Sequence, residues 1–223
     1  MRFINFFCLR WSPRNHKSAH RIHPCVAKAW SSTSRFCLVN PTTNKKKFYF
    51  QLVKQQYAQE WPQFFTATIQ EWKHLLKEDK YKNIIVDSLK FLVKEGKVAI
   101  NGFVIMSNHL HIIWQSKGNN SIQKIQNSFI KHTSKEFKKQ LEKDNNLEGY
   151  EVNDIDRKYN FWQRDSLNIE LFTTDVFNQK LNYIHFNPVK AGLCGLPEDY
   201  YFSSALFYEK GIANFGFIEH YLG

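Results

Sequence analysis

Two apolar segments separated by a two-residue turn constrain the fold of this chain most strongly. Val98–Met106 and His109–Gln115 are rich in β-branched and aromatic side chains, which favours a strand for each. Ser107 and Asn108 between them are residue types found in tight turns. The sequence therefore predicts that the two strands form an antiparallel hairpin.

Further strand and helix signals lie on both sides of this hairpin. Strands are expected at 64–69 and 168–172, and helices at 81–95, at 122 to about 142 and at 175–187. The helix boundaries rest on a stop at Gly96, caps at Ser121 and Thr174, and a break imposed by Pro188. The polar stretch 143–158 is expected to be an exposed loop or a partly helical insertion. The order strand, helix, strand, strand, helix, strand, helix predicts an α+β sandwich of ferredoxin-like type with an antiparallel sheet.

Residues 1–56 differ from the rest of the chain in composition. They hold eleven of the 31 Lys and Arg residues and no acidic residue, and they lack sustained helical or strand periodicity. The rest of the chain keeps 20 basic residues against 20 acidic ones, so a nucleic-acid surface there requires a local patch. A DNA-binding arm, an organelle-targeting segment and an extension outside the working protein remain open. We favour a poorly ordered extension at 1–56, followed by one domain at 57–223.

The remaining composition points to a soluble protein of the cell interior. No apolar run approaches the length of a membrane-spanning helix, and the opening residues lack a secretory signal pattern. Four cysteines without a CxxC pair suggest neither a disulfide framework nor a structural zinc site. We expect a cytoplasmic, nucleoid-associated protein of bacterial type.

His109 and His111 are the first candidates for chemistry. Alternate side chains of a strand share a face, so both imidazoles are expected to point the same way while Leu110 packs in the core. Two imidazoles on one strand suit a divalent cation, with other ligands supplied from elsewhere. Taken alone, two histidines at this spacing are more often structural or surface residues than ligands.

Tyr183 and Asn187 form the second candidate cluster. They lie four residues apart on the last predicted helix and therefore share one face of it. That face could meet the histidine pair across the sheet, with Asn187 as a third metal ligand and Tyr183 as a nucleophile towards a phosphodiester. The residues alone leave open the simpler interpretation of Tyr183 as a core residue with its hydroxyl at the surface.

Three segments in combination resemble the REP-associated tyrosine transposases, which belong to the single-tyrosine HUH superfamily of insertion-sequence transposases. The segments are Asn101–Ile113, Phe161–Gln163 and Tyr183–Gly192. They combine His-hydrophobic-His after an apolar strand with a downstream Tyr-x-x-x-Asn-Pro-Val-x-x-Gly motif. The resemblance covers about residues 60–208 and leaves the N-terminal extension outside.

The resemblance implies a function and a role for each matching residue. His109 and His111 match the histidines that hold Mg²⁺ or Mn²⁺, and Asn187 matches the amide that completes this metal site. Tyr183 matches the tyrosine that forms a 5′-phosphotyrosine and frees a 3′-hydroxyl. The implied substrate is single-stranded DNA bearing hairpins or palindromic repeats. The ligand types alone do not distinguish Mg²⁺ from Mn²⁺ or rule out zinc.

Candidate DNA contacts lie on the helix predicted from residue 122 and in the segment after residue 160. Lys131, Lys135 and Lys138 recur at helical spacing and could line a phosphate track, although a solvated helix face explains them equally well. Trp162 and Arg164 are candidates for stacking on or contacting DNA, although a tryptophan is more often buried.

Alternative functions also remain open at this stage. The chain could be a non-catalytic DNA-binding descendant that recognises palindromic repeats, or it could act on RNA. A homodimer is left open, and with it whether Tyr183 serves its own metal site or that of a partner.

Overall fold

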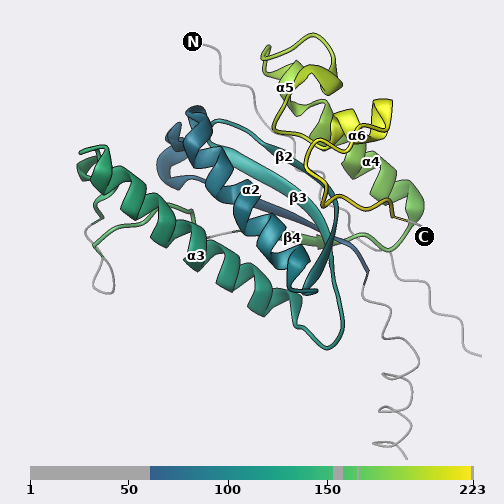
Figure 1. Ribbon diagram of the computed structural model, residues 1–223, viewed down its shortest axis with the longest axis horizontal. Coiled ribbons are helices and arrows are strands. Elements are labelled where there is room, and N and C mark those ends of the chain that lie inside the picture. Colours follow the sequence, from purple (N-terminus) through teal and green to yellow (C-terminus); the bar gives the residue numbers. More distant parts are fainter. Residues whose placement is uncertain (1–60, 153–157, 165, 222–223) are drawn as a thin grey trace, which may run out of the picture. The chain divides into compact units, whose positions relative to one another are not determined.

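A computed structural model describes residues 61–152, 158–164 and 166–221 (Figure 1). The chain divides into two units, residues 1–49 and 50–223, and all described residues belong to the second. The extension predicted at residues 1–56 lies outside the described residues. Within the described ranges, no helix is both long enough and apolar enough to cross a membrane.

The centre of the fold is a four-stranded antiparallel sheet in the order β2-β3-β1-β4. Its strands are β1 (Gln63–Thr68), β2 (Val98–Ile105), β3 (His109–Ser116) and β4 (Leu167–Glu170). The hairpin between β2 and β3 closes at the expected turn, where the Met106 amide donates to the His109 carbonyl oxygen over 2.8 Å. This strand order is that of the ferredoxin-like sandwich, and the fold prediction is confirmed.

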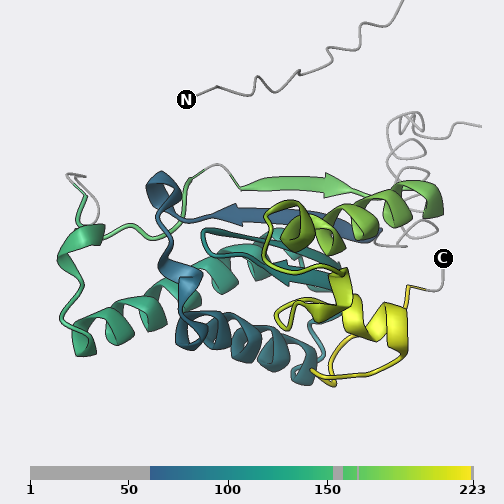
Figure 2. The same ribbon diagram turned by 90° about the horizontal axis from the view of Figure 1, so that it is seen from above.

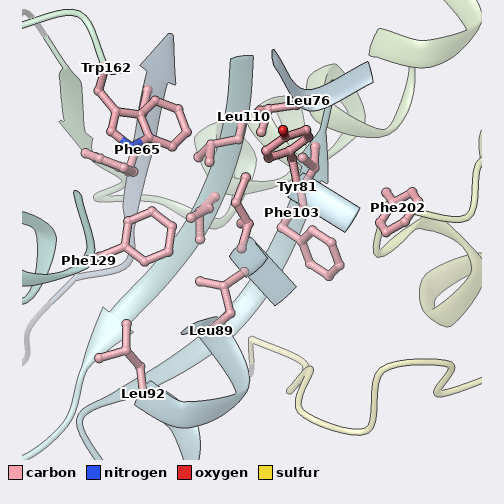
Figure 3. Packing of buried hydrophobic residues seen from close by; sticks show 14 of the residues in the cluster. Phe65, Leu76, Tyr81, Leu89, Leu92, Phe103, Leu110, Phe129, Trp162 and Phe202 are labelled. Atoms are coloured by element: carbon pink, nitrogen blue, oxygen red, sulfur yellow. The ribbon is translucent and has the colours of Figure 1, made fainter. Parts of the chain in front are cut away.

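Two helices cover one face of the sheet. α2 (Asp79–Lys94) and α3 (Ile122–Lys143) lie side by side over the strands (Figures 1 and 2). α3 buries one apolar stripe, in which each residue follows the last by four positions: Ile125, Phe129, Thr133, Phe137 and Leu141. These side chains join the main core with Phe65, Leu110 and Trp162 (Figure 3). As predicted, α2 is followed by Gly96, which adopts a φ of 62°.

α4 (Thr174–His185) packs on the opposite face of the sheet. Its Phe177, Leu181 and Ile184 form a second apolar cluster with side chains of β1, β2 and β3. Gly102 in β2 allows this close approach, because a Cβ atom there would lie 2.7 Å from Cδ1 of Leu181. The sheet therefore carries two helices on one face and the helix with the candidate tyrosine on the other.

The boundaries of α4 differ from the sequence-based prediction. Thr173, not Thr174, caps the helix, since its side chain accepts a hydrogen bond from the Val176 amide over 3.3 Å. α4 ends at His185 rather than Asn187, and a separate turn, α5 (Asn187–Lys190), begins there. Pro188 lies in the first turn of α5, where its missing N–H costs no helical hydrogen bond.

The C-terminal part of the chain was not predicted and protects the edge of the sheet formed by β2. The Ile105 amide donates to Phe202 and the Ser204 amide donates to Phe103, each over 2.9 Å. α6 (Ala205–Lys210) follows directly. The shorter helical turns are η1 (Gln70–Trp72), η2 (Leu75–Lys77), η3 (Glu148–Tyr150) and η4 (Pro197–Asp199).

Candidate metal and tyrosine site

His109 and His111 lie next to each other on the face of β3 that α4 covers. Their ring centroids are 4.9 Å apart. In the antiparallel register, His111 is opposite Thr66 and His109 is opposite Thr68 of β1. The His111 ring also stacks on Phe64, with centroids 5.2 Å apart. The expectation that both imidazoles share one face of the sheet is thus confirmed.

Neighbouring side chains orient both imidazoles through the same ring nitrogen. Nδ1 of His111 lies 2.7 Å from Oγ1 of Thr66, and Nδ1 of His109 lies 2.7 Å from Oδ1 of Asn108. Nε2 of His111 is buried and has no hydrogen-bond partner among the described residues. A histidine held at Nδ1 with a free Nε2 is arranged as a metal-binding histidine is, because the outer contact fixes the ring and its tautomer.

Burial keeps both imidazoles in the neutral form. It lowers the pKa of His111 to about 3, with smaller contributions from the nearby charges of His109 and Lys180. Burial also lowers the pKa of His109. Because a metal ion binds the neutral imidazole, neither ring has to lose a proton at neutral pH before it can act as a ligand.

Tyr183 of α4 lies against the histidine pair. The centroid of its ring is 5.4 Å from that of His111 and 6.2 Å from that of Phe64. The side chain is 43% exposed, so a large substrate can reach it from solvent. The structure therefore brings Tyr183 and the two predicted metal ligands together within one chain.

Asn187 lies one helical turn beyond Tyr183, at the start of α5. Its side-chain Nδ2 is buried without a hydrogen-bond partner among the described residues. No hydrogen bond recorded for this part of the chain joins Asn187 to either histidine. The unsatisfied atom is a hydrogen-bond donor, whereas a metal would be bound by the carbonyl oxygen Oδ1, so the metal-binding role of Asn187 stays a prediction.

The donor set fits an open catalytic metal site better than a closed structural one. In the described ranges, no cluster of three or more His, Cys, Asp or Glu side chains could hold an ion. His109 and His111 are the two donors that the described geometry brings together, and an ion held by them would need further ligands from an amide oxygen, water or substrate. Such open coordination is what metal-assisted catalysis requires.

Two lysines that sequence reasoning missed place positive charge at the tyrosine. Nζ of Lys180 lies 5.8 Å from the centroid of the Tyr183 ring, and Nζ of Lys190 lies 5.6 Å from it. Lys180 is also 4.9 Å from the Phe64 centroid. Lys180 could have been found from its i, i+3 spacing to Tyr183 on one helix. Lys190 could not, because it lies beyond the break at Pro188.

The five candidate DNA-contact residues all line one groove, which runs between α3 and residues 158–164 with Ser166 and has a volume of about 1150 Å³. Lys131, Lys135 and Lys138 are exposed on it. Trp162 is an exception, since it is only 3% exposed and its indole N–H donates to Oγ1 of Thr133 over 3.0 Å. Its ring packs in the core beside Phe65 (Figure 3), so the suggested stacking of Trp162 on a base is wrong.

No protein-family model matches the sequence, and no curated protein matches it significantly. Among solved structures, a REP-associated tyrosine transposase bound to a REP hairpin is similar at 19% identity with a TM-score of 0.51, over 75% of this chain and 96% of that one. A candidate transposase from Deinococcus radiodurans R1 is 11% identical with a TM-score of 0.41, over 57% of this chain and 91% of that one. The chain therefore has the fold of a REP-associated tyrosine transposase.

Proposed function

We propose that this chain is a metal-dependent endonuclease and transposase that cleaves and rejoins single-stranded, hairpin-bearing DNA through a 5′-phosphotyrosine at Tyr183. The observation that carries this proposal is the 5.4 Å separation between the ring centroids of His111 and Tyr183. The likeness in fold to a hairpin-bound transposase and the two sequence motifs support the same assignment.

In the cleavage step, Oη of Tyr183 attacks the scissile phosphorus. A bond forms between Oη and phosphorus, and the bond between phosphorus and the 3′-oxygen breaks. The phenol releases its proton to solvent, and the departing oxygen takes one up to become the 3′-hydroxyl. Because the phosphodiester energy is kept in the phosphotyrosine, a 3′-hydroxyl can reverse the step and rejoin a strand without a nucleotide cofactor.

His109, His111 and the amide of Asn187 would hold Mg²⁺ or Mn²⁺. When bound, the ion supplies Lewis-acid polarisation of the scissile phosphate. Thr66 and Asn108 each contact Nδ1 of one histidine, which leaves Nε2 as the ring nitrogen that would bind the ion. The protein thus pre-orders its ligands before the substrate arrives.

Lys180 and Lys190 would stabilise negative charge on the attacking phenol and on the phosphate. Both ammonium groups lie within 6 Å of the Tyr183 ring centroid, and one lysine precedes the tyrosine in the sequence while the other follows it. A fixed positive charge placed where negative charge develops lowers the barrier to reaction. All of these groups belong to one chain, which supports action of Tyr183 on its own metal site without a second subunit.

The proposal is tested by incubating labelled hairpin-bearing single-stranded DNA with the protein and Mn²⁺ and then denaturing the mixture. The wild-type chain is expected to yield a covalent protein–DNA adduct and a free 3′-hydroxyl fragment. Tyr183→Phe is expected to bind the hairpin and yield neither. Hairpin binding by the wild type without any adduct would favour the alternative, a non-catalytic protein that recognises palindromic repeats.

A further inference from the structure

A groove remains on the molecule that the cleavage chemistry does not use. It lies between α3 and residues 158–164 with Ser166, and we call it the α3 groove. Its cationic lining consists of Lys131, Lys135, Lys138, Lys158 and Arg164. None of the described residues that line it carries a carboxylate. Lys138 pairs with Glu142 over 3.5 Å and Lys158 pairs with Glu151 over 3.2 Å. Because the body of the chain is balanced in charge overall, the positive charges of this lining that have no such pair among the described residues, those of Lys131 and Lys135, mark a binding surface for a polyanion.

Three of the lysines form a row along one side of α3. Lys131, Lys135 and Lys138 are separated by four and three residues and are all exposed. At about 1.5 Å rise per residue, the row spans roughly 10 Å, and along this length of duplex axis one DNA strand carries about three phosphate charges, one per about 3.4 Å of axis. Lys131 and Lys135 make no ion pair with any carboxylate in the described part of the chain. Their charges are available to a ligand.

The rest of the lining suits contacts to a sugar–phosphate backbone. The groove also presents hydroxyl and amide side chains, which hydrogen-bond phosphate oxygens without reading base sequence. They are Asn127, Ser128, Ser134, Asn160, Gln163 and Ser166. Trp162 lies beneath them and fixes the wall of the groove to α3 through its hydrogen bond to Thr133. The wall of the groove is therefore anchored in the core.

The groove connects to the strand that carries the histidines. The Gln163 amide donates to the Thr68 carbonyl oxygen over 2.8 Å, and Thr68 is paired with His109 in the register of β1 and β3. Gln163 and His109 therefore lie on opposite sides of β1, and two inter-strand spacings separate them by about 10 Å. A few nucleotides suffice to cover this distance.

We propose that the α3 groove holds the phosphodiester backbone of the DNA next to the cleaved strand, and that this DNA passes Gln163 to reach the histidine–tyrosine site. The inference rests on the proposed function for the identity of the polyanion. It adds a second contact surface, on the α3 side of the sheet, while the chemistry takes place on the α4 side. Electrostatic binding of the DNA backbone and cleavage of the phosphodiester bond are thus assigned to different residues.

The test compares two double variants of the full-length chain that remove the same charge from the same helix. Lys131→Gln with Lys135→Gln removes the unpaired lysines of the groove. Lys124→Gln with Lys139→Gln removes two exposed lysines of α3 that do not line it. Binding of a labelled DNA hairpin with single-stranded flanks is measured between about 50 and 200 mM salt, a range over which phosphate contacts weaken strongly.

The groove variant is expected to bind about tenfold more weakly at low salt, and its slope of log K against log salt should flatten by roughly 1.4 to 1.8, for two lost contacts. The control variant should keep the wild-type affinity and slope. Equal slopes for the two variants would overturn the proposal and would leave the groove to another partner, such as an acidic protein.

Adduct formation at saturating DNA separates this inference from the proposed function. The groove variant should still form the covalent adduct once it is saturated, whereas Tyr183→Phe should bind with the wild-type salt slope and form none. A groove variant that binds normally but cannot form the adduct would contradict the division of roles. If the wild type forms no adduct but the groove variant shows a flattened salt dependence of binding, the cleavage chemistry is contradicted and DNA binding in the α3 groove is still supported.

Discussion

Oγ1 of Thr66 lies 2.7 Å from Nδ1 of His111 and fixes the orientation of a ring whose other nitrogen is buried and has no partner among the residues that the structure describes. The two residues come from adjacent strands and face each other directly in the register. Thr66 thus prepares His111 for a ligand without contacting that ligand itself. Contacts of this kind to metal-binding histidines typically contribute about ten- to a hundredfold in metal affinity.

Replacing Thr66 by Val is therefore expected to weaken Mn²⁺ binding by about tenfold or more, because the ring loses its fixed tautomer and orientation. Calorimetric titration of the chain with Mn²⁺ measures the effect. Thr68→Val is the matched control, since Thr68 faces His109 from the same strand and makes no recorded side-chain hydrogen bond in the described ranges. Equal affinities for the two variants would show that Thr66 has no such role.

A second prediction concerns Lys180, whose Nζ lies 5.8 Å from the Tyr183 ring centroid. Lys180→Met should slow adduct formation at saturating DNA by about tenfold or more, because the developing charge loses a fixed cation. Lys180→Arg keeps the charge and should retain most of the rate. Single-turnover kinetics with labelled hairpin DNA measures both. A similar loss in the Met and Arg variants would point to packing on Phe64 instead.

The pH dependence of stability should reveal the buried His185, whose Nε2 lies 2.8 Å from Oγ of Ser204. Burial lowers the pKa of His185 to about 4. Below its ordinary pKa of about 6.5 the unfolded chain takes up a proton that the folded chain refuses, so stability is full above pH 6.5 and falls towards pH 4. The loss attributable to this one group approaches about 3 kcal/mol.

Urea unfolding between pH 4.5 and 7.5, with chelator present, measures this dependence. His185→Gln should be less stable at pH 7.5 and should lose less stability on acidification. His132→Gln, which alters an exposed histidine of α3, should follow the wild-type curve. His111 contributes in the same direction, so the variant is expected to reduce the slope without abolishing it. An unchanged slope in His185→Gln would contradict the assignment.

Much of this arrangement could be predicted from the sequence because it depends on local periodicity. Alternation along a strand placed His109 and His111 on one face, as the structure has them. The single helix predicted to carry both Tyr183 and Asn187 is instead two helices, since α4 ends at His185 and α5 begins at Asn187. The family resemblance then indicated that the histidine strand and the tyrosine helix meet. The order of strands and helices was enough to identify the sandwich.

The remaining features depend on tertiary packing, which local patterns do not encode. The role of Thr66 follows from the register between β1 and β3, and a one-residue slip would remove it. Trp162 carries no signal in its sequence context that separates a DNA-stacking ring from a core residue. The segment at 202–204 has no strand periodicity of its own, yet it bonds to the edge of β2.

A fourth prediction follows from the contact of Gly102 with α4. A Cβ atom at Gly102 would lie 2.7 Å from Cδ1 of Leu181, two residues before Tyr183. Gly102→Ala should therefore destabilise the chain by about 1–3 kcal/mol through overpacking and should displace the tyrosine helix. Gly149→Ala meets no atom within 4 Å and is the control. Thermal unfolding and adduct formation report the two effects, and normal values of both would show that α4 tolerates the larger residue.

The most direct test of the central claim is to identify the amino acid joined to DNA after reaction with Mn²⁺. Proteolysis of the trapped adduct followed by mass spectrometry should find the nucleotide on the peptide that contains Tyr183, attached through a 5′-phosphate. Tyr183→Phe should give no adduct while binding hairpin DNA with wild-type affinity. An adduct on a different residue, or cleavage that persists in Tyr183→Phe, would contradict the account.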